Sequence, residues 1–169
     1  MNTKRLYIYQ IIAKFLPPSR CNQLKARLLR WCGAYVGRNV EIMSSAKFYG
    51  EVELNIGDNA FIGHDAMIMG PSGSKITIED YAKVGSRSIL VTGYHKLELY
   101  GPCVFGEGMS ADIVIKKGSV VNTASIVYPG IIVGSMSYVS ACSVVTHDVP
   151  DYTRVGGVPA RIIEKYKVK

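Results

Sequence analysis

Residues 115–149, IKKGSVVNTASIVYPGIIVGSMSYVSACSVVTHDV, decide the fold because an aliphatic residue returns at every sixth position. The whole chain contains thirteen such blocks, each with a small or β-branched residue at its fifth place. The blocks begin at Val36, Ile42, Phe48, Ile56, Ile62, Ile78, Val84, Ile115, Val121, Val127, Val133, Val139 and Val145. The fifth residues are Val40, Ala46, Val52, Ala60, Ala66, Ala82, Ser88, Ser119, Ser125, Ile131, Ser137, Ser143 and Val149. This period predicts a parallel β-helix with the first and fifth side chains pointing inward.

Glycine recurs at the second place of the block. Examples are Gly57, Gly63, Gly85 and Gly134. A turn between short strands favours a residue that tolerates positive φ. We therefore predict a left-handed backbone conformation at this place.

Two breaks in the repeat predict where the binding face lies. A short insert occupies Gly70–Ser74, and a longer interruption separates Leu90 from Ile115. Solenoids place insertions on one face, often the binding face, because their strands are committed to stacking. We therefore predict an all-β fold, with a long loop at 93–112 inserted between coils, and expect the chemistry in that loop.

Length and composition favour a single domain. The chain has 169 residues, 48% of them hydrophobic, which suffices for one substantial core. The four cysteines, Cys21, Cys32, Cys103 and Cys142, form no CxxC pair, and no secretory signal is recognisable. We therefore expect reduced thiols, a cytoplasmic protein and no metal site. No run approaches the roughly 20 apolar residues that span a bilayer.

Basic charge is concentrated at the N-terminus. Residues 1–40 contain eight Lys and Arg and no Asp or Glu, whereas the whole chain has a net charge of +7. Neither a helix-turn-helix pattern nor a basic strand interleaved with aromatic residues accompanies this charge, so we do not expect nucleic-acid binding.

The same segment predicts two amphipathic helices separated by Pro17-Pro18. The apolar positions at helical spacing are Ile8, Ile11, Ile12, Phe15 and Leu16, then Leu24, Leu28 and Trp31 or Cys32. Two roles are open: the helices cap an exposed strand edge or cover a neighbouring subunit, or they rest on the inner membrane as a peripheral contact. We predict helices in 1–33, the β-helix in 34–163 and a basic tail in 164–169.

The segment Ile113–Ile163 resembles the C-terminal half of the bacterial hexapeptide-repeat acyltransferases, particularly the sugar and polysaccharide O-acetyltransferases of cell-surface glycan synthesis. The matching motifs are Pro129-Gly130, Val144-Val145-Thr146, Asp148-Val149-Pro150 and Gly156-Gly157-Val158-Pro159-Ala160-Arg161. With the upstream repeats, the resemblance covers residues 36–163. It implies a left-handed parallel β-helix, a homotrimer, and acetyl-CoA bound as acyl donor between subunits.

The resemblance identifies His95 as the general base that takes a proton from the acceptor hydroxyl. A sugar hydroxyl is nearly un-ionised at neutral pH, and an imidazole, which ordinarily titrates near pH 6.5, suits this task. Lys96 follows His95, where many relatives have an acid. Glu98, Glu107, Asp112 or a backbone carbonyl therefore remain candidates for orienting the ring, and Tyr94 is a candidate substrate contact.

The resemblance also assigns residues to the donor. An extended pantetheine arm needs narrow rungs of small residues, here Asn122, Thr123 and Ala124, and one coil later Ser140, Ala141 and Cys142. Relatives usually have Gly at the places of Asn122 and Ser140, and Asn tolerates left-handed geometry. Thr146, His147 and Arg161 match the nucleotide end of the donor site. Open alternatives are a plain surface role for His147 and a capping role for Arg161.

The sequence as a whole favours an acetyltransferase that moves an acetyl group from acetyl-CoA to a hydroxyl of a sugar or glycan, including a lipid-linked one. Cys103 and Cys142 have no activating base beside them, which disfavours an acyl-enzyme. The alternatives are an amino-sugar N-acetyltransferase and a non-catalytic scaffold or membrane adaptor. A zinc hydratase of the γ-carbonic-anhydrase kind is disfavoured because His64, His95 and His147 are dispersed.

Overall fold

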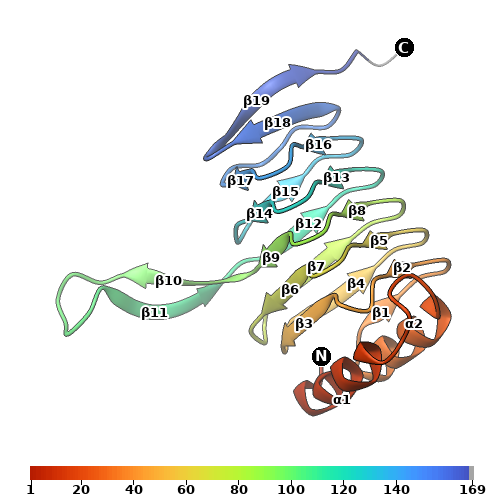
Figure 1. Ribbon diagram of the computed structural model, residues 1–169. Helices are drawn as coiled ribbons and strands as arrows, with labels where there is room; N and C mark the ends of the chain where they lie inside the picture. The colour runs from red at the N-terminus through yellow and green to blue at the C-terminus, as the bar shows by residue number, and fades with distance from the viewer. Residues whose placement is uncertain (168–169) are drawn as a thin grey trace.

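The computed structural model describes residues 1–167 and consists of two N-terminal helices followed by a parallel β-helix (Figure 1). The helices are α1 (Thr3–Lys14) and α2 (Asn22–Trp31). They lie across one end of the solenoid, and the last described strands lie at the other end. None of the helices within 1–167 is long and apolar enough to span a membrane.

Three sheets form the faces of the solenoid. Sheet A contains β1 (Tyr35–Val36), β4 (Glu53–Ile56), β7 (Lys75–Ile78), β12 (Ile113–Ile115) and β15 (Ile132–Val133). Sheet B contains β2 (Glu41–Ile42), β5 (Phe61–Ile62), β8 (Lys83–Val84), β13 (Val120–Val121), β16 (Tyr138–Val139), β18 (Thr153–Gly157) and β19 (Ala160–Lys165). Sheet C contains β3 (Lys47–Gly50), β6 (Met67–Gly70), β9 (Ile89–Val91), β14 (Ile126–Val127) and β17 (Val144–Val145). The chain passes from A to B to C in each coil, so three edges separate the sheets.

The six-residue period sets the core. All first-place and fifth-place residues of the thirteen blocks are buried, and equivalent residues stack in parallel register. Val121, for example, pairs with Val84 in the preceding coil and with Val139 in the next. The predicted left-handed parallel β-helix with N-terminal helices is thus confirmed.

The second-place glycines serve a purpose other than the one predicted. Within residues 1–167, positive φ falls at the fourth place of the block, for example at Asn59 and Met136, and not at the second. The second place instead lies against the backbone of the next coil. A Cβ atom on Gly134 would lie 2.5 Å from the amide nitrogen of Asp151, closer than real Cβ contacts. The prediction of a left-handed turn at these glycines was therefore wrong, and close approach is the reason for them.

The helix α1 contacts β3, and α2 contacts β1 and β2. The buried side chains of α1 are Leu6, Tyr9 and Ala13. The Tyr9 ring meets Phe48 edge to face, with centroids 5.7 Å apart.

The apolar positions named from the sequence in the first helix, Ile8, Ile11, Ile12 and Phe15, are exposed. On α2, Leu24 and Trp31 are also exposed, whereas Ala26, Leu29 and Cys32 are buried. The predicted helices are present, and α1 contacts the core through Leu6, Tyr9 and Ala13 and not through the apolar positions named from the sequence. Both faces of α1 are apolar, and the face formed by Leu6, Tyr9 and Ala13 is the one that packs against the first coil.

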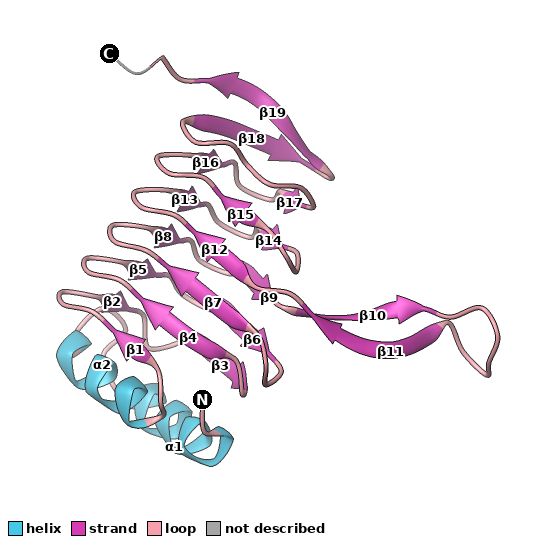
Figure 2. Ribbon diagram, turned by 180° about the vertical axis from the view of Figure 1, so that it is seen from behind, coloured by secondary structure: helices cyan, strands magenta, loops and turns pink. Residues whose placement is uncertain are grey.

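The predicted loop at 93–112 is an ordered hairpin that leaves the solenoid (Figure 2). Strands β10 (Gly93–Leu97) and β11 (Phe105–Ser110) pair antiparallel in a sheet of their own. We call this hairpin the arm. A second antiparallel pair, β18 and β19, closes the C-terminal end. Strand β19 includes the first two residues of the predicted tail at 164–169, and residues 168–169 of that tail lie outside the described part of the chain.

Candidate active site

His95 lies on β10 and is exposed on the arm. Its Nδ1 atom is 3.0 Å from the carbonyl oxygen of Gly106 on β11. The ring meets Phe105 edge to face, with centroids 4.9 Å apart. These two contacts from the opposite strand fix the orientation of the imidazole.

A backbone carbonyl, and none of the three candidate carboxylates, orients the ring. Glu107 pairs with Lys96 at 3.2 Å, and Asp112 accepts a hydrogen bond from the amide of Lys75 at 2.8 Å. The carboxylate of Glu98 makes no hydrogen bond or ion pair within residues 1–167. Lys96, next to His95 in the sequence, thus holds one candidate, Glu107, in an ion pair.

Gly106 and Phe105 are site residues that sequence reasoning missed. A Cβ atom on Gly106 would lie 3.0 Å from both the Lys96 carbonyl oxygen and the Glu98 Cβ atom. Glycine therefore permits the close strand approach that brings its carbonyl to His95. The only signal in the sequence is the pair Gly106 and Gly108 in an otherwise bulky strand.

Tyr94 precedes His95 on β10, opposite Met109. Because side chains alternate along a strand, Tyr94 and His95 project from opposite faces of the arm. A single chain therefore does not bring these two predicted residues together.

The residues predicted to bind the pantetheine chain of the donor stack on the edge between sheets B and C. Thr123 and Cys142 face each other in successive coils, since the Cys142 amide donates to the Thr123 carbonyl at 2.9 Å. Asn122 does not use left-handed geometry, which falls at Ala124 and Cys142. Its side chain instead accepts from the Thr123 amide and donates to the Tyr138 hydroxyl. Similarly, the Ser140 hydroxyl accepts from Arg154 at 3.3 Å.

Two of the three residues predicted for the nucleotide end line the same cleft. His147 and Arg161 line one cleft of about 330 Å³ at the C-terminal end of the solenoid. The Thr146 hydroxyl is 3.0 Å from His147 Nδ1. Arg161 donates only to the adjacent Ala160 carbonyl among the described residues, which leaves most of its guanidinium donors for an anion.

The candidate residues occupy two different edges of the solenoid. The arm follows β9 of sheet C and precedes β12 of sheet A. His147 lies between β17 of sheet C and Val149, which bridges Val133 of sheet A, so both groups lie on the C–A edge. Asn122 and Ser140 follow strands of sheet B, so their coil corners lie on the B–C edge. The full width of sheet C separates the two groups within one chain. Only a neighbouring copy could place a B–C edge beside this arm.

His64 lies on an exposed corner, with Nδ1 3.2 Å from the Ser45 hydroxyl. Within residues 1–167, no three His, Cys, Asp or Glu side chains are grouped closely enough to hold a metal ion.

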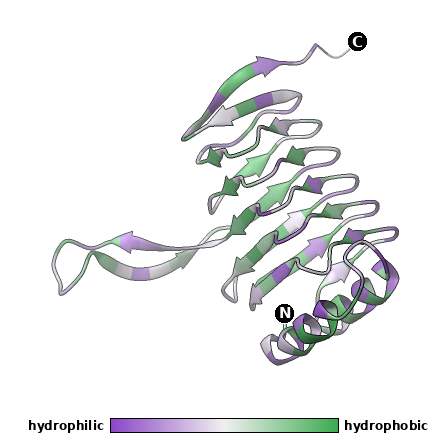
Figure 3. Ribbon diagram, viewed as in Figure 1, coloured by the Kyte–Doolittle hydropathy of each residue, from purple (hydrophilic) through white to green (hydrophobic). Residues whose placement is uncertain are grey.

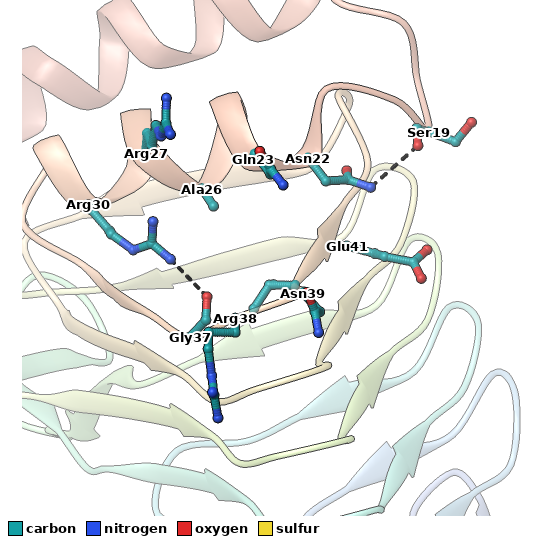
Figure 4. Close-up of a pocket in the computed structure, with 11 residues that line it drawn as sticks. Ser19, Asn22, Gln23, Ala26, Arg27, Arg30, Gly37, Arg38, Asn39 and Glu41 are labelled. Atoms are coloured by element: carbon teal, nitrogen blue, oxygen red, sulfur yellow. Dashed lines mark hydrogen bonds between the residues drawn. The ribbon is translucent and has the colours of Figure 1, made fainter.

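A separate cleft of about 740 Å³ lies between α2 and the first coil (Figure 4). Two of its three guanidinium groups are already engaged: Arg30 donates to the Gly37 carbonyl, and Arg38 pairs with Asp58. The pair with Arg38, whose amide and side chain both donate to the carboxylate, lowers the pKa of Asp58. None of the predicted site residues lines this cleft.

Two curated proteins of Escherichia coli resemble the chain along most of its length. A dTDP-4-amino-4,6-dideoxy-D-glucose acyltransferase is 30% identical over 162 residues, covering 79% of this chain and 83% of that protein. A protein named as a colanic acid biosynthesis acetyltransferase, WcaF, is 30% identical over 141 residues, covering 83% and 74%. No family model matches the chain.

The solved structures agree with this result. A hexapeptide-repeat containing acetyltransferase from Vibrio cholerae, complexed with acetyl coenzyme A, superposes with a TM-score of 0.79 and 26% identity. The match covers 98% of this chain and 87% of that chain, so it includes the helices, the solenoid and the arm.

Proposed function

Given that the chain belongs to the hexapeptide-repeat acyltransferases and is an enzyme of acyl transfer, we propose that it moves an acetyl group from acetyl-CoA to a sugar hydroxyl in surface-polysaccharide synthesis. The likeness to WcaF supports the polysaccharide role, and the acetyl coenzyme A in the Vibrio cholerae structure supports the donor. The four free cysteines support work in a reducing cytoplasm.

The observation that carries the proposal is the hydrogen bond between His95 and Gly106. A carbonyl oxygen can only accept, so His95 Nδ1 is the protonated nitrogen. The other ring nitrogen, Nε2, then carries a free lone pair, as a general base requires. Because the orienting group is neutral, the imidazole is held in one tautomer without a fixed ion pair.

In the proposed reaction, the acceptor oxygen attacks the carbonyl carbon of the thioester while His95 Nε2 takes the hydroxyl proton. A C–O bond forms and the C–S bond breaks. The proton on His95 then passes to the leaving thiolate, which departs as free CoA. The base returns to its starting state, and no acyl-enzyme is needed.

We also propose that the active site is shared between subunits of a homotrimer. The division of the candidate residues between the C–A and B–C edges supports this arrangement. So does the arm, whose apolar side chains are largely exposed in one chain: Tyr100 is 92% and Leu97 80% exposed. Apolar surface of this kind is usually covered by a partner.

Replacing His95 with Ala tests the base. We expect turnover to fall by roughly 10²–10⁴-fold, while acetyl-CoA affinity measured by calorimetry changes little, because the ring acts on the acceptor proton. Lys117→Ala, on the A–B edge that carries no candidate residue, should leave both values unchanged. Near wild-type turnover in the His95 variant would remove His95 as the base. Failure of the wild-type protein to bind acetyl-CoA would favour a scaffold.

An amino-sugar N-acetyltransferase is the second candidate, favoured by the name of the dTDP-amino-sugar relative. The two candidates differ in the acceptor atom. CoA release should be measured in two assays, one with a dTDP-amino sugar as acceptor and one with the matching hydroxyl sugar. Transfer to the amine alone would replace our first proposal by the second.

A further inference from the structure

The outward face of the N-terminal helices is apolar although nothing within residues 1–167 covers it. Tyr7 of α1 is 69% exposed, and Phe15, the residue that caps the C-terminal end of α1, is 82% exposed. We call the exposed apolar set the N-terminal face; it consists of Tyr7, Ile8, Ile11 and Ile12 of α1, the cap residue Phe15, and Leu24 and Trp31 of α2. Figure 3 shows hydrophobic segments along α1, at the free end of the solenoid.

This exposure is not a sign that α1 is loosely attached. Leu6, Tyr9 and Ala13 anchor the opposite side of the helix in the core. The amino terminus donates to the carbonyl of Glu51 at 3.1 Å. A helix that is apolar on both sides normally packs against an apolar partner on each side. The protein core accounts for one side only.

Basic side chains surround the N-terminal face. Lys4, Arg5 and Lys14 of α1 are all exposed, and no acidic residue occurs before Glu41. Arg5 lies over the Trp31 ring, 5.1 Å from its centroid, and donates to the Trp31 carbonyl at 2.9 Å. This contact joins the two helices and holds a cation beside an amphipathic ring.

The positive charge around the N-terminal face indicates what kind of partner covers it. A second copy of the face would bring like charges together, which costs free energy unless acids interleave. An anionic bilayer supplies negative headgroups for the Lys and Arg side chains and an apolar layer for Phe15 and Ile8. Trp and Tyr, present here as Trp31 and Tyr7, favour the boundary between those layers.

We propose that the N-terminal face docks on the surface of an anionic lipid bilayer, with the helices lying in the plane of the headgroups. The solenoid then extends away from the membrane. This inference stands on the helices alone and does not depend on the acyl acceptor.

Deletion of residues 1–16 would not test the proposal, because it would also uncover Phe48 and the first coil. Surface substitutions avoid this problem. The test is co-sedimentation of the full chain with vesicles of phosphatidylcholine alone and with equimolar phosphatidylcholine and phosphatidylglycerol. We expect binding to the anionic vesicles only. Raising the salt from 0.01 M to 1 M shortens the Debye length from about 30 Å to about 3 Å and should release most of the protein.

Matched variants separate the apolar and charged contributions. Ile8→Ser with Phe15→Ser should abolish binding, whereas Tyr81→Ser, also an exposed apolar position, should not. Lys14→Gln should weaken binding about fivefold, whereas Lys83→Gln on β8 should leave it unchanged. Equal binding by the double variant and the wild type, or no binding to anionic vesicles, would overturn the proposal. A change of oligomeric state in the double variant, seen by sedimentation, would instead assign the face to a second copy.

Discussion

At the scale of single residues, the second-place glycines show how a pattern can be read correctly and explained wrongly. Their positions follow from the six-residue period alone. Their purpose depends on the distance to the next coil, which the period does not contain. Positive φ falls two residues later, at places occupied by residues as different as Asn59, Arg87 and Met136. Stacking therefore imposes that conformation whatever the local preference.

Gly134→Ala should destabilise the protein by about 1–3 kcal/mol, because the new methyl group would meet the amide of Asp151 at 2.5 Å. Thermal or urea unfolding measures the change. Gly101→Ala is the control: its Cβ atom would come no closer than 3.8 Å to the Cys103 carbonyl. Equal stability of the two variants would contradict close approach as the reason for glycine.

At the scale of elements, the repeated coils can be predicted from the sequence, whereas the contacts of elements that occur once cannot. Thirteen blocks agree on the inward positions, so an error in one block is corrected by the others. The helix α1 occurs once and offers two apolar faces, and only contact with Phe48 selects between them. Similarly, the arm has no repeat. The hydrogen bond between the His95 ring and the Gly106 carbonyl joins residues eleven apart across the hairpin.

Contact between α1 and the core leaves one polar atom without a partner. The Tyr9 hydroxyl is buried and makes no hydrogen bond within residues 1–167. Burial, followed by the nearby Cys32, raises the pKa of this hydroxyl. Tyr9→Phe should therefore stabilise the protein by about 1 kcal/mol, since it removes an unsatisfied buried group and keeps the ring. Tyr7→Phe, at an exposed position, should have no effect on the melting temperature. A loss of stability in the Tyr9 variant would reveal a partner for the hydroxyl.

At the scale of the whole molecule, the candidate site cannot be assembled from the sequence because its parts lie on two edges. The identities of His95, His147 and Arg161 come from motifs, and the structure brings His147 and Arg161 to one cleft. The relation of His95 to the B–C edge depends on how copies associate. Contacts between copies are made by surface residues, which follow no repeating pattern in the sequence.

Mixing two inactive variants tests the proposal that the site is shared between subunits of a trimer. His95→Ala removes the base, and Ala141→Trp fills the donor edge between sheets B and C. If each site takes its base and its donor edge from different subunits, random mixed trimers should recover about a quarter of wild-type activity. Co-expression with two affinity tags, followed by an assay of CoA release, measures this. Mixed trimers without activity would place both residues of a site in one chain.

The reversal of the chain at β18 and β19 has a consequence for the protein in a crowded cell. The last coil of a parallel solenoid is a template on which the first coil of another molecule could grow, and repeated addition would produce a filament. Strand β19 runs antiparallel to β18, so sheet B offers an incoming parallel coil the wrong polarity. At the opposite end, α1 and α2 lie over the first coil. Both ends of this repetitive fold are thus unsuited to the addition of further parallel coils.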